Sequence, residues 1–323
     1  MSQATSDKTN TVPAEAGTVL VRPQKRTSPD QAALRRPIPR PSDRAMLRAS
    51  GWAMVVFAAL FVGLVFYLAV LSNISEHRSQ DLLAKQFRNE LAFGTAPIGQ
   101  VDINGVLLKQ GAPVALLSIP SIGVNNTVVE GTSSRTLTDG PGHRRDTPLP
   151  GQTGVSVIYG RQAAYGGPFA NIGALKVGAT ITTTTGQGQA TYRVIDIRQA
   201  GDRAPSLAST AGRLTLVTAS GTPFISNTVV RVDAELVGKP FATPQAVLRP
   251  GSLGSAEDPL SSDSSGWLPL FLWGELALAV TVGVVFALRR WGTWHTWIVA
   301  VPVALLIGTE MAKQVVIVLP NLY

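Results

Sequence analysis

The stretch GRLTLVTAS, from Gly212 to Ser220, decides the fold because it belongs to a series of short β-rich runs separated by turns. Signals such as Pro150-Gly151 and Gly166-Gly167 mark these turns. The candidate strands are Ala115–Ile119, Val124–Val129, Val155–Tyr159, Thr180–Thr184, Thr191–Ile197, Arg213–Thr218 and Thr228–Val237. Seven or eight short strands in about 120 residues predict an all-β barrel or sandwich, and their periodicity does not choose between the two.

Three long apolar segments predict membrane helices. They are Gly51–Leu71, Trp267–Leu288 and Trp297–Leu319. Each is close to the roughly 20 residues that a helix needs to cross about 30 Å of hydrocarbon. We interpret the first segment as a retained anchor, because a long tail precedes it and no small-x-small cleavage site follows it.

The chain therefore divides into segments of different character. We expect a disordered basic tail at 1–48, transmembrane helices at 49–72, 267–288 and 297–319, a juxtamembrane helix or stalk at 73–113, a β-domain at 114–238, a flexible linker at 239–266 and a cytoplasmic loop at 289–296. Within the stalk, apolar residues at helical spacing predict a helix over Ser75–Phe93.

The distribution of basic residues predicts the orientation. The tail before Gly51 has nine basic residues against four acids, and Arg289 and Arg290 lie between the last two spans. The positive-inside rule then places both in the cytoplasm and the β-domain outside a multi-pass plasma-membrane protein. The net charge of +8 does not indicate nucleic-acid binding, because the tail has no aromatic residue to stack on bases. Anionic lipid is the partner that we expect for the tail.

Four blocks occur in a recognisable order. They are LLSIPSIGVNNTVVEGT (Leu116–Thr132), GPGHRRDTPLPGQTG (Gly140–Gly154), VIYGRQAAYGGPF (Val157–Phe169) and GRLTLVTAS. Over roughly residues 116–238 the chain resembles the sortase family, in particular the class E type of Gram-positive actinobacteria. This resemblance implies an eight-stranded sortase-like β-barrel at the cell envelope, with few short helices, one of them over Phe169–Leu175.

The resemblance also shows which catalytic residues are missing. A sortase uses a cysteine thiolate as nucleophile, a histidine as acid and base, and an arginine that steadies the substrate or oxyanion. The cysteine position is Ala219 in this chain, which has no cysteine at all, and the histidine position is Arg161. A guanidinium stays protonated near neutral pH and cannot shuttle protons. The arginine position is Val229, and Arg231 lies two residues further along the same strand face.

Other polar residues could still line the old substrate groove. The candidates are His143, Tyr159, Arg161, Tyr165, Ser220 and Arg231. The guanidinium of Arg161 could bind an acidic peptide tail or a cell-wall polymer, or it could pair with a local acid or extend to solvent. A serine nucleophile is disfavoured, because Ser220 and Thr218 point to the opposite strand face from Ala219.

We expect no cofactor and no metal, because His77, His143 and His295 are the only histidines and fall in different segments. The charged residues within the membrane segments are Glu275, Glu310 and Lys313. Charges in lipid are usually paired, so we expect Glu275 with Lys313 or Glu310 with Lys313. The alternative is a contact with another membrane protein.

Three functions are consistent with these residues. The first is a catalytically inactive sortase-like protein that binds an envelope protein, a peptide or a cell-wall polymer within a membrane assembly. The second is a sortase-type transpeptidase or hydrolase with relocated catalytic residues. The third is a structural envelope scaffold whose groove is filled by side chains, and the surroundings of Ala219 and Arg161 discriminate it from the first.

Overall fold

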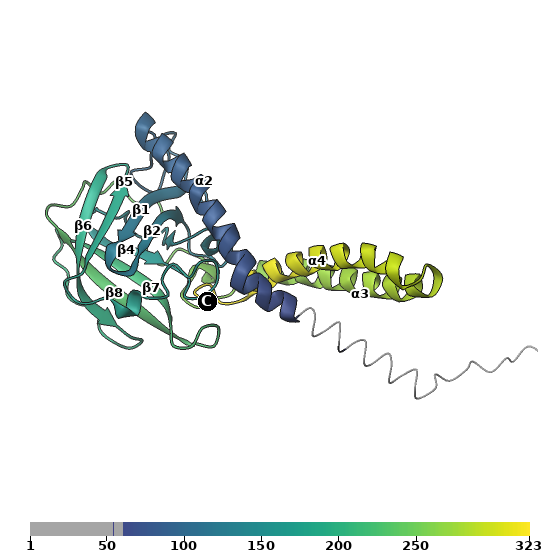
Figure 1. The fold of residues 1–323 in the computed structure, drawn as a ribbon. Coiled ribbons are helices and arrows are strands. Elements are labelled where there is room, and N and C mark those ends of the chain that lie inside the picture. The colour runs from purple at the N-terminus through teal and green to yellow at the C-terminus, as the bar shows by residue number, and fades with distance from the viewer. Residues whose placement is uncertain (1–53, 55–60) are drawn as a thin grey trace, which may run out of the picture. The chain divides into compact units, whose positions relative to one another are not determined.

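The structure is a computed structural model that describes Met54 and residues 61–323. Its central element is a closed barrel with strand order β1-β2-β3-β4-β7-β8-β6-β5 (Figure 1). The strands are β1 (Pro113–Ile119), β2 (Val124–Glu130), β3 (Gly142–His143), β4 (Gly154–Tyr159), β5 (Thr180–Thr185), β6 (Gly188–Arg198), β7 (Gly212–Ser220) and β8 (Thr228–Val237). The barrel confirms the eight-stranded fold, whereas the basic tail and part of the span Gly51–Leu71 (residues 51–53 and 55–60) lie outside the described residues.

All seven candidate strands are present, with bounds within a few residues of those predicted. The eighth strand, β3, has only two residues and pairs with β2 and β4, so no side-chain alternation reveals it in the sequence. The barrel core consists of apolar residues such as Leu117, Ile158, Leu216 and Val232, all fully buried. This core fixes the register of β7 against its neighbours, because a slip by one residue would turn its apolar side chains outward.

Helix α2 (Ser72–Phe93) lies against the barrel and begins three residues before the predicted start. Phe87 is its fully buried anchor, and the Gln80 amide accepts from Thr127 N at 2.7 Å and donates to Asp139 O at 2.6 Å. The helix ends at Gly94, whose φ of 66° suits glycine. The short helix predicted over Phe169–Leu175 is a single 3₁₀ turn at Ile172–Ala174.

The segment 239–266, for which we expect a flexible linker, makes hydrogen bonds to the barrel and its flanks. Phe241 N donates to Gly151 O at 2.8 Å. Val247 N and Leu248 N both donate to Gln100 Oε1. These contacts bring the segment along the barrel before the next helix begins.

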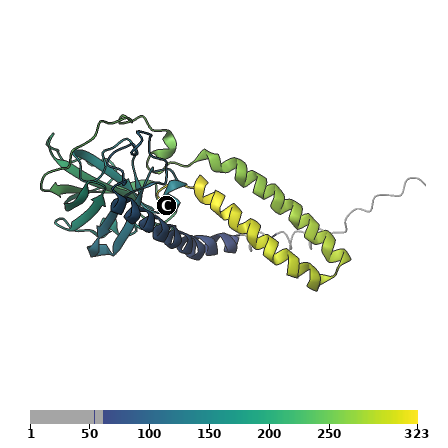
Figure 2. The same ribbon diagram turned by 90° about the horizontal axis from the view of Figure 1, so that it is seen from above.

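Helices α3 (Trp267–Arg290) and α4 (Thr293–Val318) form an antiparallel pair, side by side in both views (Figures 1 and 2). By length and composition, two helical segments are apolar enough to cross a membrane: Ser264–Ala287 and Trp294–Val318. The described residues therefore support two of the three predicted spans. The remaining span, Gly51–Leu71, can be compared only over its described part, in which residues 61–71 are helical.

The residues after α4 return to the barrel. Asn321 N donates to Ser261 O at 2.9 Å, and Asn321 Nδ2 donates to Thr132 O at 2.8 Å. Leu322 and Tyr323 are buried in a second apolar cluster, separate from the main barrel core. The end of α4 is thereby held against the loop that follows β2.

Candidate functional site

The position that the sequence resemblance assigns to the nucleophile lies near the end of β7. Ala219 is directly opposite Val229 of β8, and opposite residues of an antiparallel pair share one face. Ala219 is only 1% exposed. It belongs to an apolar cluster that we call the Ala219 pocket, consisting of Leu137, Tyr159, Val217, Ala219, Val229, Leu322 and Tyr323. A methyl group at this position offers no lone pair for attack on a carbonyl.

Arg161, at the position just after β4 that the sequence resemblance assigns to the histidine, is 1% exposed. Its Nη2 donates to Ser134 O at 2.7 Å and to Ser134 Oγ at 3.0 Å. Its Nε donates to Leu137 O at 3.2 Å and its Nη1 to Tyr323 O at 3.0 Å. Both predicted alternatives for a structural Arg161 differ from this arrangement, because its described partners are oxygens of Ser134, Leu137 and Tyr323 rather than the side chain of an Asp or Glu or solvent. Burial lowers the pKa of Arg161 to about 10, so the side chain is still a cation at neutral pH.

Tyr165 completes the surroundings of Arg161. The guanidinium lies 5.5 Å from the centroid of the Tyr165 ring, within the range of a cation–π contact. Tyr165 has a φ of 53°, and its hydroxyl is 3.0 Å from that of Tyr67, which precedes α2. Tyr165 therefore supports the arginine and connects the barrel to the preceding helix rather than lining an open groove.

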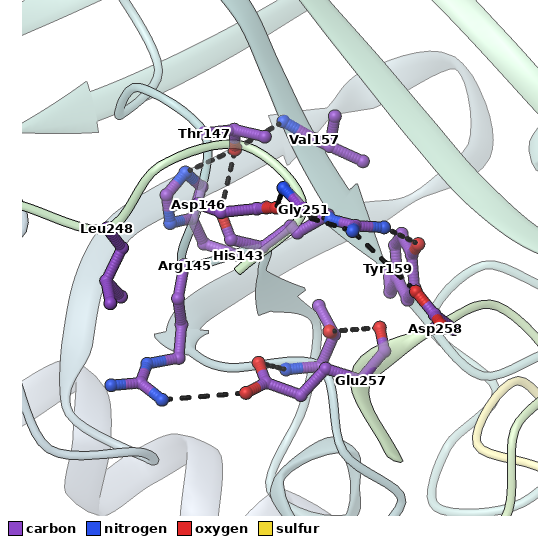
Figure 3. A network of polar contacts seen from close by, with 12 residues as sticks. His143, Arg145, Asp146, Thr147, Val157, Tyr159, Leu248, Gly251, Glu257 and Asp258 are labelled. Carbon is purple, nitrogen blue, oxygen red and sulfur yellow. Dashed lines mark hydrogen bonds and ion pairs between the residues drawn. The ribbon is translucent and has the colours of Figure 1, made fainter. Parts of the chain in front are cut away.

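His143, a groove candidate, is fully buried in a separate polar network (Figure 3). Its Nδ1 is 2.8 Å from Glu130 Oε2 and its Nε2 is 3.0 Å from Pro148 O. Burial by itself would lower the pKa of His143, but the Glu130 carboxylate raises it overall. With both ring nitrogens facing oxygen acceptors, the imidazole has no free lone pair. Although Thr147 Oγ1 lies 3.2 Å from Nε2, His143 is not arranged as a general base.

Tyr159 and Arg231 lie on the same side of the barrel as Ala219. Tyr159 belongs to the Ala219 pocket, and its hydroxyl accepts from Arg144 Nη1 at 3.2 Å. Burial raises the pKa of Tyr159, against the opposing charges of Arg144 and Arg231. Arg231 is opposite Val217, on the face that carries Val229, so its position agrees with the predicted strand face.

The linker closes this side of the barrel through charged contacts (Figure 3). Arg144 binds Asp146, with Nε to Oδ1 at 2.8 Å, and lies 3.7 Å from Asp258. Asp146 Oδ2 also accepts from Gly251 N at 2.8 Å. Arg145 lies 3.5 Å from Glu257. The loop after β3 therefore binds the linker through both ion pairs and a main-chain hydrogen bond.

Two hydroxyl side chains, those of Thr218 and Ser220, flank Ala219 along β7. Thr218 Oγ1 donates to Gly160 O at 2.8 Å, so it is engaged with the backbone. Ser220 is partly exposed at the end of β7 and alternates to the other strand face. Neither is hydrogen-bonded to the ring of His143, whose described partners are Glu130, Pro148 and Thr147.

Sequence reasoning missed the residues that fill the pocket. Ser134, Leu137, Leu322 and Tyr323 contact Arg161 or belong to the Ala219 pocket, and none is among the sequence candidates. The available signal was an apolar pair after Pro320, at the end of a span predicted to emerge on the barrel's side. A contact such as that between Arg161 and Tyr323, which are 162 positions apart, leaves no local pattern.

The charged residues of the two apolar helices follow one of the two expected pairings. Lys313 Nζ lies 2.6 Å from Glu310 Oε1, an i,i+3 pair along α4, while no ion pair of Glu275 occurs among the described residues. Over the same residues, no group of three or more potential ligands is arranged to hold a metal ion.

Comparison with known proteins gives a family for the barrel. Residues 117–235 match the sortase domain family model. No curated protein matches the chain. Similar solved structures include a sortase D5 transpeptidase from Clostridium perfringens, at 24% identity over 51% of this chain and 99% of that chain, with a TM-score of 0.40.

Two further sortases are similar over about the same region. Sortase A from Corynebacterium diphtheriae, a lid mutant, is 22% identical over 49% of this chain and 94% of its own, with a TM-score of 0.38. Sortase E from Streptomyces avermitilis is 26% identical over 47% of this chain and 100% of its own, with a TM-score of 0.36. From the family match and the closed barrel that contains the matched residues, we conclude that this chain carries a sortase domain.

Proposed function

We propose that the chain is a catalytically inactive sortase-domain protein that serves as a binding or assembly subunit at the cell envelope. The observation that carries this proposal is the pair of residues at the vacated positions. Ala219 has no nucleophilic atom, and Arg161 directs its guanidinium at backbone oxygens of Ser134, Leu137 and Tyr323. Acyl transfer needs a nucleophile beside a proton acceptor, and this pair supplies neither.

The proposal extends to class and location. The order and spacing of the four sequence blocks support a class E type. The two apolar helices α3 and α4 support attachment to the plasma membrane, and the basic residues around the spans support a cytoplasmic N-terminus with the barrel outside. A second and third span are more than a tether requires, which favours a subunit of a membrane assembly.

A structural scaffold is the second candidate function, and one observation favours it. Leu322 and Tyr323 fill the pocket beside Ala219, with exposed fractions of 0% and 9%. A filled pocket offers no open groove for a peptide or a cell-wall polymer. Co-purification of the full chain in mild detergent separates the candidates, because an assembly subunit retains a stoichiometric partner and a scaffold does not require one.

Relocated catalysis is the remaining alternative, and a transpeptidation assay tests it. The full chain in detergent is incubated with a sorting-motif peptide and an amine acceptor, beside an active sortase as positive control, and products are separated on a gel. We expect no transpeptidation product and no hydrolysed peptide. Turnover by the wild-type chain that Arg161→Ala or Ser220→Ala abolishes would refute the proposal.

A further inference from the structure

The Ala219 pocket is filled by residues of this same chain. Its walls come from β4, β7, β8 and the loop after β2, and its contents are Leu322 and Tyr323, which follow α4. The linker and both helices α3 and α4 separate β8 from this segment along the chain. The occupant is therefore a separate piece of chain inserted between barrel elements rather than a side chain of the barrel itself.

Two backbone oxygens of the segment accept hydrogen bonds from residues that directly follow β4. Gln162 N donates to Leu322 O at 2.8 Å, and Arg161 Nη1 donates to Tyr323 O at 3.0 Å. The Tyr323 hydroxyl donates to Ser226 O. Tyr323 N also donates to Pro320 O at 3.2 Å, so the segment forms a turn, and its two consecutive side chains Leu322 and Tyr323 are both buried. The contacts are those of a bound peptide.

The loop between β7 and β8 closes over the tyrosine. Phe224 packs edge-on against the Tyr323 ring, with centroids 6.4 Å apart. Phe224 has a φ of 64°, a conformation that a bulky side chain rarely adopts. Next to it, Ile225 is 78% exposed. The loop therefore holds a strained backbone around its occupant, and this strain can relax when Tyr323 leaves.

Asn321, which precedes the two buried residues, has one buried polar atom without a hydrogen-bond partner among the described residues. Its Nδ2 donates to Thr132 O and to Asp258 O, but its buried Oδ1 has no hydrogen-bond partner among the described residues. A buried acceptor without a donor destabilises the bound state relative to the solvated one. The strained Phe224 and the unsatisfied Asn321 oxygen both favour an occupant that can exchange.

We propose that Leu322 and Tyr323 are an exchangeable internal ligand of the Ala219 pocket, which keeps α4 docked on the barrel and excludes other peptides. The ligand class is a short peptide turn that contains a leucine followed by a tyrosine, and the same sequence supplied in trans competes for the pocket once the internal segment leaves. This inference is independent of the proposed lack of catalysis, since the pocket can be closed in an active or an inactive domain.

Cysteine accessibility tests the proposal directly, because the natural chain has no cysteine. The Ala219→Cys chain in detergent is treated with a maleimide, and alkylation is followed by mass. We expect modification to be slower than in the Ala219→Cys chain that also carries Leu322→Ala and Tyr323→Ala, by at least about tenfold if the pocket opens by local release. Equal rates in the two chains would overturn the proposal.

A matched control reports on folding. Ser220→Cys places a thiol on the neighbouring, partly exposed position, and its alkylation rate is expected not to change with Leu322→Ala and Tyr323→Ala. If the control rate also rises, the single Leu322→Ala variant replaces the double one. Rapid alkylation of the Ala219→Cys chain with an intact C-terminal segment contradicts the proposal regardless of how the other variants fold.

A synthetic peptide with the sequence of residues 317–323 then tests exchange. Added to the Ala219→Cys chain with Leu322→Ala and Tyr323→Ala, it is expected to restore protection of the thiol, whereas a scrambled peptide does not. The same peptide is expected to leave the Ser220→Cys control unaffected. A thiol that reacts equally fast with either peptide would show that the pocket does not accept this ligand in trans.

Discussion

Two buried arginines of the barrel are stabilised in opposite ways. Arg198 on β6 binds Asp233 on β8, with Nε to Oδ2 and with Nη2 to Oδ1 at 3.2 Å, and Asp233 also accepts from Thr215 Oγ1 at 2.7 Å. Its hydrogen bonds to Asp233 raise the pKa of Arg198. Arg161 has backbone oxygens as partners instead, and burial lowers its pKa.

The difference lies in where the partners come from. Arg198 and Asp233 are on paired strands, so the ion pair forms together with the barrel. Arg161 takes its partners from the loop at Ser134 and Leu137 and from Tyr323 beyond α4. One arginine therefore stabilises the barrel alone, while the other also depends on the docking of the C-terminal segment.

The largest effect is expected from Arg161→Met. It leaves the oxygens of Ser134, Leu137 and Tyr323 without their donor, and buried unsatisfied acceptors cost about 1–3 kcal/mol each, so we expect a loss of about 4 kcal/mol in unfolding free energy. Denaturant unfolding of the full chain in detergent measures it. Arg161→Lys, which keeps a donor and the charge, is expected to lose less. Unchanged stability of Arg161→Met would mean that the guanidinium does not hold the segment.

Asp233→Asn is the corresponding change at the other arginine. It leaves Arg198 without a carboxylate, and breaking a buried pair in this way costs about 3 kcal/mol. The sharper readout is the alkylation of Ala219→Cys, which we expect to accelerate in Arg161→Met and to stay unchanged in Asp233→Asn. Equal acceleration of alkylation in both variants would contradict our expectation that Arg161, and not Arg198, holds the C-terminal segment in the Ala219 pocket.

Glu76 on α2 is a buried carboxyl that can be compared with the two buried arginines, because its ion-pair partner is a histidine. Its side chain is 3% exposed, and among the described residues its ion-pair partner is the exposed His77, with Nδ1 3.5 Å from Oε2. Burial raises the pKa of Glu76 to about 7, although His77 opposes the shift. The folded state holds this proton more tightly than the unfolded state does. The free energy of unfolding is therefore highest below the pKa that Glu76 has in the unfolded state, and it falls as pH rises through about 7.

The expected change with pH is at most about 3 kcal/mol, since one unit corresponds to about 1.4 kcal/mol. Glu76→Gln keeps an oxygen that can accept from Asn126 Nδ2, as Glu76 Oε1 does at 3.1 Å. We expect this variant to reduce the loss of stability between pH 5 and pH 8, two conditions chosen on either side of the shifted pKa. Parallel pH profiles of variant and wild type would contradict the raised pKa.

The smallest effect is expected from Tyr323→Phe. It removes the hydroxyl that donates to Ser226 O but keeps the ring against Phe224. The loss of one hydrogen bond is worth about 1 kcal/mol, so alkylation of Ala219→Cys is expected to accelerate only a few-fold. If the Ala219→Cys thiol is alkylated as fast with Tyr323→Phe as with Leu322→Ala and Tyr323→Ala together, then the hydroxyl, rather than burial of the side chains, retains the segment.

Most of the fold follows from sequence patterns, and most of the pocket does not. Strands such as Thr228–Val237 and the helices over Ser72–Phe93 and Trp267–Arg290 have side-chain periodicity or long apolar runs that local reading detects. The two-residue β3 is too short for such a pattern. Ala219 and Arg161 are identified through motif position, because a family motif fixes a place in the barrel.

The surroundings of these residues escape prediction for a physical reason. His143 has the residue type of a groove residue, but its partner Glu130 lies 13 positions away on a neighbouring strand. Tyr323 reaches Arg161 across 162 positions. Such contacts depend on tertiary packing, which a single sequence does not display. The residue type of Arg161 excludes proton shuttling near neutral pH. Its hydrogen bonds to Ser134, Leu137 and Tyr323 are visible only in the fold.

Intact-mass measurement of the purified wild-type chain tests the central claim most directly. The chain in detergent is incubated with a sorting-motif peptide without an amine acceptor, so that any acyl-enzyme would accumulate, and an active sortase serves as positive control. We expect the mass of the chain to stay that of the unmodified protein. A mass increase equal to the acyl portion of the peptide, located by fragmentation to a residue of the barrel, would contradict it.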